Sequence, residues 1–147
     1  MYKKILVPLD GSRLAEIALP HAESLALQYR ADLVLLSVID PPPMTGRDDP
    51  AVQLFQHEMD TRKQEAEIYL KALKNQFSKK TIKAKYFVNL GSVVQNIIDI
   101  ANSESVDLAV IASHGRSGLQ RVFFGSVAAG ALNRIEHPLM VIRRSNQ

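Results

Sequence analysis

The chain has 147 residues, of which 46% are hydrophobic, and this composition predicts one compact domain over residues 1–147 with a core of its own. The absence of cysteine excludes disulfides and thiolate metal sites. The formal net charge is +3, but basic residues are mixed with acidic ones over most of the chain and only 6% of residues are aromatic, so a nucleic-acid-binding surface is not predicted.

The amino-terminal residues predict neither a secretion signal nor a membrane anchor. The apolar run in MYKKILVPLD stops at Pro8 and Asp10. It is too short for the apolar region of a signal peptide or for a membrane-spanning helix. We therefore expect a cytoplasmic protein that does not bind membranes.

The first half of the chain contains two predicted strand–helix units. Residues 4–9 and 32–39 are short apolar runs of the kind that is buried on both faces of a parallel sheet. Residues 13–29 and 51–77 carry apolar side chains at helical spacing. Pro20 removes one helical N–H donor, so we expect the first of these helices to be kinked or irregular before that residue.

The second half continues the alternation with three further strands. Residues 81–88 alternate lysines with apolar residues, which is typical of an edge strand. Ser92 and Gln95 have the spacing of a capping box for the helix that follows. Residues 106–111 predict a buried strand, and residues 139–142 predict a final short one. Strands that alternate with helices in this way predict an α/β fold with a parallel sheet.

The connection after the strand at 106–111 is the part of the sequence that most strongly suggests a function. It runs from Ala112 to Gly125, well beyond the roughly 2–6 residues usual between a strand and a helix. It contains Gly115 and Gly118, and Gly125 stands directly before Ser126, which we expect to cap a helix. Free N–H groups at a helix N-terminus attract anions, and glycines let a phosphate approach the backbone. This stretch therefore predicts an anion site.

Three separated segments are expected to meet at one crevice. In open α/β sheets the ligand lies beyond the carboxyl ends of the strands, where the strand order reverses. The segments at that edge are residues 8–12, 38–41 and 111–126.

The sequence resembles the universal stress protein family over nearly its whole length, in KKILVPLDGS at the start, SVID after the second strand and SHGRSGLQRVFFGSVA after the fourth. The nucleotide-binding branch of that family has Gly, two residues, Gly, nine residues, Gly, then Ser or Thr. Here nine residues separate Gly115 from Gly125 and Ser126 follows, while Ala112 stands in place of the first glycine. The resemblance implies a flavodoxin-like, doubly wound five-stranded parallel sheet in strand order 3-2-1-4-5 with helices on both faces. It also implies bound ATP, with or without Mg²⁺, and a homodimer.

The resemblance further implies roles for individual residues. Asp10 would contact the ribose, and Val38 with Ile111 would flank the adenine. The phosphates would be surrounded by Gly115, Arg116, Gly125, Ser126 and Val127. The whole predicted nucleotide site comprises Pro8, Leu9, Asp10, Val38, Ile111, Ala112, Gly115, Arg116, Gly125, Ser126 and Val127.

Simpler interpretations stay open for several of these positions. Asp10 could cap the helix that follows it. We interpret His114 as a loop histidine bonded to backbone, because the other histidines do not lie at ligand spacing. Ala112 costs about 1–2 kcal/mol if the motif needs a positive φ there, and adds only a methyl group if φ is negative.

The sequence does not predict efficient catalysis. It lacks three catalytic signatures: a Gly-x-Ser-x-Gly elbow, a phosphate loop ending in Gly-Lys-Ser/Thr, and a pair of acid and base carboxylates. We therefore assign no catalytic residue and no metal site. The leading hypothesis is an ATP-binding stress-response dimer whose nucleotide state governs contact with a protein partner. The alternatives are an interaction or chaperone-like dimer of the same fold without nucleotide, and a slow ATP hydrolase in which Asp10 helps to hold magnesium.

The predicted final strand is the expected dimer contact. It is short and wholly apolar, comprising Leu139, Met140, Val141 and Ile142. An exposed edge of this kind invites pairing, and pairing with its twin about a two-fold axis covers both edges at once.

Overall fold

The computed structural model describes residues 1–41, 49–114 and 125–144. Its centre is a five-stranded sheet in the order β3-β2-β1-β4-β5 with parallel pairing throughout. The order confirms the predicted 3-2-1-4-5 arrangement, and β3 is an edge strand as its lysines predicted. The strands are β1 (Lys4–Pro8), β2 (Asp32–Ile39), β3 (Ala84–Leu90), β4 (Leu108–Ala112) and β5 (Leu139–Ile142).

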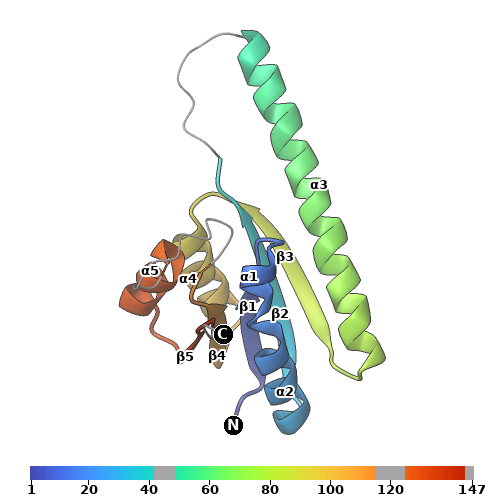
Figure 1. Cartoon of the computed structure of the whole chain (residues 1–147), viewed down its shortest axis with the longest axis vertical. Coiled ribbons are helices and arrows are strands. Elements are labelled where there is room, and N and C mark those ends of the chain that lie inside the picture. Colours follow the sequence, from blue (N-terminus) through green and yellow to red (C-terminus); the bar gives the residue numbers. More distant parts are fainter. Residues whose placement is uncertain (42–48, 115–124, 145–147) are drawn as a thin grey trace.

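Helices cover both faces of the sheet, so the molecule has three layers (Figure 1). The first three helices pack on one face and the last two on the other, each over its own buried apolar cluster. The buried strand residues alternate between the clusters, with Ile5 and Val7 in one and Leu6 in the other. The helices are α1 (Arg13–Glu16), α2 (Leu19–Tyr29), α3 (Asp49–Lys79), α4 (Val93–Ser103) and α5 (Ser126–Arg134).

The predicted irregularity at Pro20 is a complete break between two helices. α1 ends at Glu16 and α2 begins at Leu19, so Pro20 lies in the first turn of a new helix, where its missing N–H costs no hydrogen bond. The break separates the short helix α1, which follows β1, from α2.

Two strands begin later than the sequence predicted, and the reason is the same for both. Thr81 and Ser105 have left-handed backbones with φ of 64° and 53°, and they follow α3 and α4. The next N–H groups fold back onto the helix ends, from Ile82 to the Phe77 carbonyl at 3.0 Å and from Val106 to the Ala101 carbonyl at 3.0 Å. These residues end a helix, so β3 starts at Ala84 and not at residue 81, and β4 starts at Leu108 and not at residue 106.

The long helix α3 extends past the carboxyl edge of the sheet (Figure 1). Its carboxyl-terminal half packs on the sheet through Leu70, Leu73 and Phe77. In the amino-terminal half of α3, Leu54 is 72% exposed. None of the described helices is both long and apolar enough to cross a membrane.

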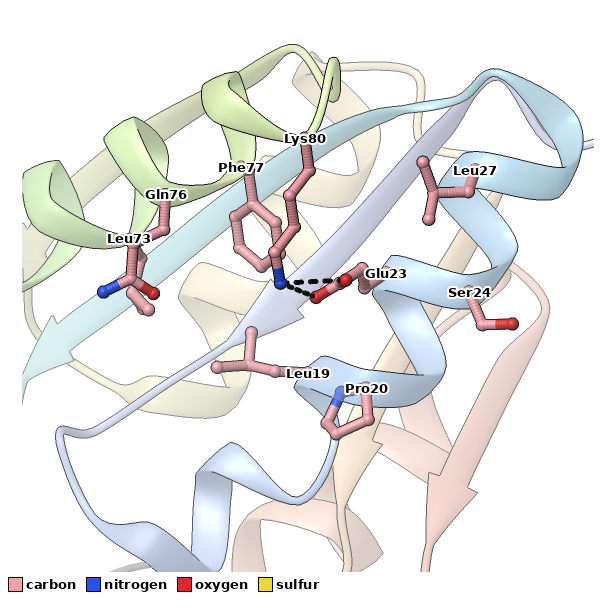
Figure 2. Close-up of a pocket in the computed structure, with 9 residues that line it drawn as sticks. All are labelled: Leu19, Pro20, Glu23, Ser24, Leu27, Leu73, Gln76, Phe77 and Lys80. Carbon is pink, nitrogen blue, oxygen red and sulfur yellow. Dashed lines mark hydrogen bonds and ion pairs between the residues drawn. The ribbon is translucent and has the colours of Figure 1, made fainter.

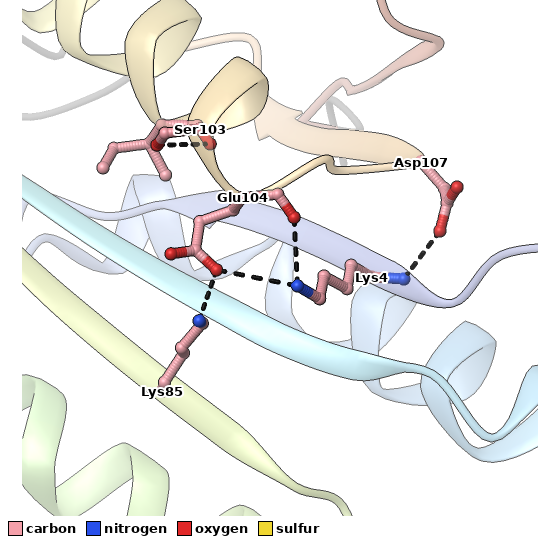
Figure 3. A network of polar contacts seen from close by, with 6 residues as sticks. Lys4, Lys85, Ser103, Glu104 and Asp107 are labelled. Carbon is pink, nitrogen blue, oxygen red and sulfur yellow. Dashed lines mark hydrogen bonds and ion pairs between the residues drawn. The ribbon is translucent and has the colours of Figure 1, made fainter.

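A polar network ties the amino-terminal edge of the sheet together (Figure 3). Glu104, after α4, forms ion pairs with Lys4 on β1, at 3.8 Å, and with Lys85 on β3. Asp107 accepts hydrogen bonds from the backbone N–H groups of Lys3, at 2.7 Å, and of Lys4, at 2.9 Å. These two bonds hold the pKa of the Asp107 carboxyl below its usual value. The network fixes the start of β1 against the loop before β4, at the opposite end of the strands from the predicted site.

Candidate functional site

A cavity of about 360 Å³ opens at the carboxyl ends of β1, β2 and β4, where the strand order reverses between β1 and β4. All nine predicted site residues that the structure describes lie in its wall. Gly115 and Arg116 lie outside the described residues. The lining residues are Pro8, Leu9, Asp10, Ala15, Leu36, Val38, Asp40, Val93, Ile111, Ala112, Ser113, His114, Gly125, Ser126, Val127 and Ala128.

One part of the cavity wall is apolar. β2 contributes Val38 and β4 contributes Ile111, the two residues expected to flank an adenine. Val93, the first residue of α4, also lines the cavity and was not among the predicted site residues. An apolar wall of this kind suits an aromatic base.

Asp10 stands in the cavity wall and also organises the start of α1. Its Oδ1 accepts a hydrogen bond from the Ser12 backbone N–H, at 2.9 Å, and another from the Ser12 hydroxyl. Ser12 is the N-cap of α1, and its Oγ accepts the Ala15 N–H at 3.2 Å. The N-cap is therefore Ser12, and the interpretation of Asp10 as the cap of this helix is wrong. Asp10 instead orients the capping residue.

Another part of the wall is the N-terminus of α5. Gly125 is the N-cap and Ser126 is the first helical residue, so the prediction that Ser126 caps this helix is wrong. No side chain caps it from Gly125, and the first N–H groups of a helix have no partner within the helix. The residues that carry these N–H groups, Ser126, Val127 and Ala128, line the cavity, and Ser126 is exposed.

Gly125 is needed because of a close backbone approach. Its N–H donates to the Ser113 carbonyl at 2.7 Å, and a Cβ at this position would lie 2.9 Å from the same oxygen. Its φ is −59°, so this position needs glycine for the close approach and not for a left-handed backbone. Glycine here lets α5 start directly against the end of β4.

Ala112, the departure from the family motif, is an ordinary strand residue. It is the last residue of β4, pairs with Ile142 of β5 and is 7% exposed. It is not among the residues with positive φ. The sequence left open whether this position needs a positive φ. It does not, so alanine here only adds a methyl group to the cavity wall.

Two further wall residues were given no binding role by the sequence. Ser113 is 4% exposed, and its Oγ lies 3.0 Å from Nδ1 of His114. We interpreted His114 only as a loop histidine, and the structure places it in the cavity wall beside the start of α5. Its position directly after a strand in the expected crevice was the signal available from sequence.

A second cavity of about 360 Å³ lies between α2 and α3, on the outer surface of the helical layer (Figure 2). Its apolar lining includes Leu19 of α2 and Leu73 and Phe77 of α3. An ion pair between Glu23 and Lys80, at 3.0 Å, spans it. Two oppositely charged groups that already neutralise each other leave this groove with no charge to select a ligand.

The chain is similar to known proteins over nearly its whole length. Universal stress protein MJ0577 of Methanocaldococcus jannaschii is 30% identical over 99% of this chain and 98% of its own. The solved structure of MJ0577 superposes with a TM-score of 0.84 at 32% identity, covering 100% of this chain and 99% of that one. The structure of UspA from Lactobacillus plantarum, 24% identical over 97% and 98% of the two chains, supports the same fold with a TM-score of 0.86. The family model described as the universal stress protein family matches residues 1–143, and the chain therefore belongs to this family.

Proposed function

We propose that this universal stress protein binds ATP in the cavity at the carboxyl ends of β1, β2 and β4 and acts as a nucleotide-dependent homodimer in the response to stress. The observation that carries the proposal is the composition of the cavity wall. Val38 and Ile111 supply an apolar part, and the N-terminus of α5 supplies N–H donors. A nucleotide has the same two parts, an apolar base and an anionic chain.

A solved relative supports the ligand class. A universal stress protein crystallised in complex with cAMP shares the fold with this chain at a TM-score of 0.65 and 20% identity. In this chain the cavity volume of about 360 Å³ lies in the range of about 300–1,000 Å³ usual for small-molecule sites. We infer that the base lies between β2 and β4 and the phosphates toward α5 and the residues that follow Ser113 and His114.

Carboxylates in the cavity wall would help to bind the Mg²⁺ that accompanies ATP. Asp10 and Asp40 both line the cavity, and Mg²⁺ is usually bound by one or two carboxylates together with phosphate oxygens and water. In the described part of the chain no three His, Cys, Asp or Glu side chains gather as a metal site of their own. Slow hydrolysis of bound ATP is the second candidate function, favoured by this pair of carboxylates.

The dimer contact that we propose is β5, the last strand of the sheet as described. The carbonyls of Pro138 and Ile142 accept hydrogen bonds from the N–H groups of Ala109 and Ser113, at 2.9 and 2.8 Å. Successive residues of a strand direct their backbone groups to opposite sides, so the N–H and C=O of Val141 face away from β4. Those groups, together with four half-buried apolar side chains, suit pairing with the same strand of a second copy.

The first experiment is to denature the freshly purified protein and identify any released small molecule by mass spectrometry, with the amount measured per chain. Near-stoichiometric ATP supports the proposal. ADP or AMP in its place favours the slow hydrolase, which product accumulation with magnesium then tests. A protein that is empty and does not bind added ATP with magnesium contradicts the proposal and favours an interaction dimer without nucleotide.

A further inference from the structure

The short helix α1 depends on tertiary contacts for its position. It has four residues, Arg13–Glu16, and the Glu16 N–H donates to the Ser12 carbonyl at 3.2 Å. A helix this short is not stable by itself in water, because its first turn orders several residues for a single hydrogen bond. The contacts at the two ends of α1 therefore decide where it lies.

The amino-terminal end of α1 belongs to the wall of the candidate nucleotide site. Asp10 lines the cavity, and its Oδ1 accepts hydrogen bonds from the N–H and the hydroxyl of Ser12, the N-cap. Ala15 lines the same cavity and is 6% exposed. β1, which leads into this segment, lies between β2 and β4 in the sheet. The segment therefore lies beside the nucleoside part of the ligand, which we place between those two strands.

The carboxyl-terminal end of α1 is bonded to the long helix α3. The hydroxyl of Tyr69 donates to Oε2 of Glu16 at 2.7 Å, and both side chains are half-buried. Tyr69 packs on the apolar cluster between α3 and the sheet, and its neighbour Leu70 is fully buried in that cluster. A hydrogen bond to a carboxylate is stronger than one between neutral groups. Tyr69 thus ties α1 to a part of α3 that is itself fixed on the sheet.

The surroundings of Tyr69 keep its hydroxyl a hydrogen-bond donor. Burial and the bond to Glu16 raise the pKa of the Tyr69 phenol, and the negative charges of Glu16 and Asp10 raise it further. The phenol therefore keeps its proton at physiological pH. The charge of Asp10 acts on Tyr69, so the wall of the cavity and the contact with α3 lie near each other, at the two ends of α1.

We propose that Tyr69 is a positioning residue of the nucleotide site, which acts through Glu16 and α1 to hold residues 10–15 of the cavity wall in their binding position. The proposal rests on the function proposed above. Tyr69 is not one of the described residues that line the cavity, so its effect must pass through other residues. Without its hydroxyl, α1 keeps the cap at Ser12 but loses the bond at its other end. A smaller fraction of the molecules then has the wall in place, and the apparent affinity falls by that fraction.

The test compares the natural protein with Tyr69→Phe, which keeps the ring and removes only the donor. Calorimetry measures the affinity for ATP and for adenosine. We expect both ligands to bind about threefold to tenfold more weakly, by about the same factor, because both contain the nucleoside that lies beside this wall. The matched control is Tyr86→Phe, which removes the hydroxyl of another half-buried tyrosine on the same apolar cluster. Its affinities should stay within about twofold of those of the natural protein.

Variants of Glu16 separate positioning from a general loss of stability. Glu16→Gln keeps an acceptor for the Tyr69 hydroxyl and should bind ATP better than Glu16→Ala, which has none. The double variant with Tyr69→Phe and Glu16→Ala should bind no more weakly than the weaker single variant, because both changes remove the same hydrogen bond. Thermal unfolding without nucleotide sets a temperature at which every variant is folded. If Tyr69→Phe does not fold, the comparison of Glu16→Ala with Glu16→Gln carries the test.

The results that overturn each idea differ. Unchanged affinities in Tyr69→Phe, or equal ATP affinities in Glu16→Ala and Glu16→Gln, refute the positioning role and leave nucleotide binding intact. Losses that add in the double variant also refute it, since the two residues then act separately. So does a loss for ATP without one for adenosine, which would place the effect at the phosphates. Failure of the natural protein to bind either ligand contradicts the proposed function itself.

Discussion

Replacing Ser126 by aspartate should stabilise the protein without nucleotide and weaken its binding of ATP. Ser126 is the exposed first residue of α5, and the N-cap before it offers no side chain. A negative charge in the first turn of a helix interacts favourably with the free N–H groups, typically by about 0.3–1 kcal/mol. For a chain of this size we expect the melting temperature to rise by about 1–4 °C.

The same charge should repel the phosphates. Two unit charges about 4 Å apart interact by about 1 kcal/mol in water and about 4 kcal/mol near a protein surface. Ser126→Asp should therefore weaken ATP binding by at least about fivefold and by as much as about a thousandfold. Adenosine, which has no phosphate, should bind within about twofold of its affinity for the natural protein.

The matched control is Ser126→Asn, which loses the same hydroxyl and has nearly the same shape but no charge. Calorimetry with ATP and adenosine, at low and at high salt, compares the two variants, and the difference should shrink at high salt because ions screen it. Equal ATP affinities for the two variants would refute the placement of the phosphates at α5. A melting temperature that falls in Ser126→Asp alone would refute the argument about the helix end.

Four further changes have defined outcomes. Ala112→Gly should leave ATP affinity within about threefold and lower stability by about 0.5–1 kcal/mol, because the position is a buried strand residue without positive φ; a gain of tenfold or more in calorimetry would show that the motif needs glycine there. Gly125→Ala should destabilise the protein by about 1–3 kcal/mol in urea unfolding, because its Cβ would lie 2.9 Å from the Ser113 carbonyl; unchanged stability would contradict this close approach. Asp107→Asn should lower the free energy of unfolding at neutral pH by about 1 kcal/mol. Because the folded-state pKa of this carboxyl is lowered, the difference from the natural protein should disappear as the pH falls below about 4. A difference that grows on acidification would contradict a lowered pKa. Val141→Pro removes an N–H that faces away from β4 and should yield a monomer in analytical ultracentrifugation, whereas Val141→Thr should remain dimeric; a dimeric proline variant would exclude pairing through β5.

Much of the architecture was predictable from local sequence signals. The apolar runs and the proline at position 20 predicted the order of strands and helices, and the lysines around Lys85 predicted an edge strand. These features depend on neighbouring residues in the chain, because periodicity and the missing N–H of proline act over a few residues. The starts of β3 and β4 were predicted too early, since Thr81 and Ser105 close the preceding helices in a backbone conformation that their residue types do not announce.

The candidate site shows the same division. The sequence by itself determined which segments reach the carboxyl edge of the sheet, and all nine described residues of the predicted site line the cavity there. Only the tertiary structure decided that Gly125 is required by the Ser113 carbonyl, that Ala112 is an ordinary strand residue and that the Ser113 hydroxyl contacts His114. The physical reason is that these properties arise where the end of β4 meets the start of α5, and a distance between two backbones that pack together is not encoded in the spacing of residues along either one.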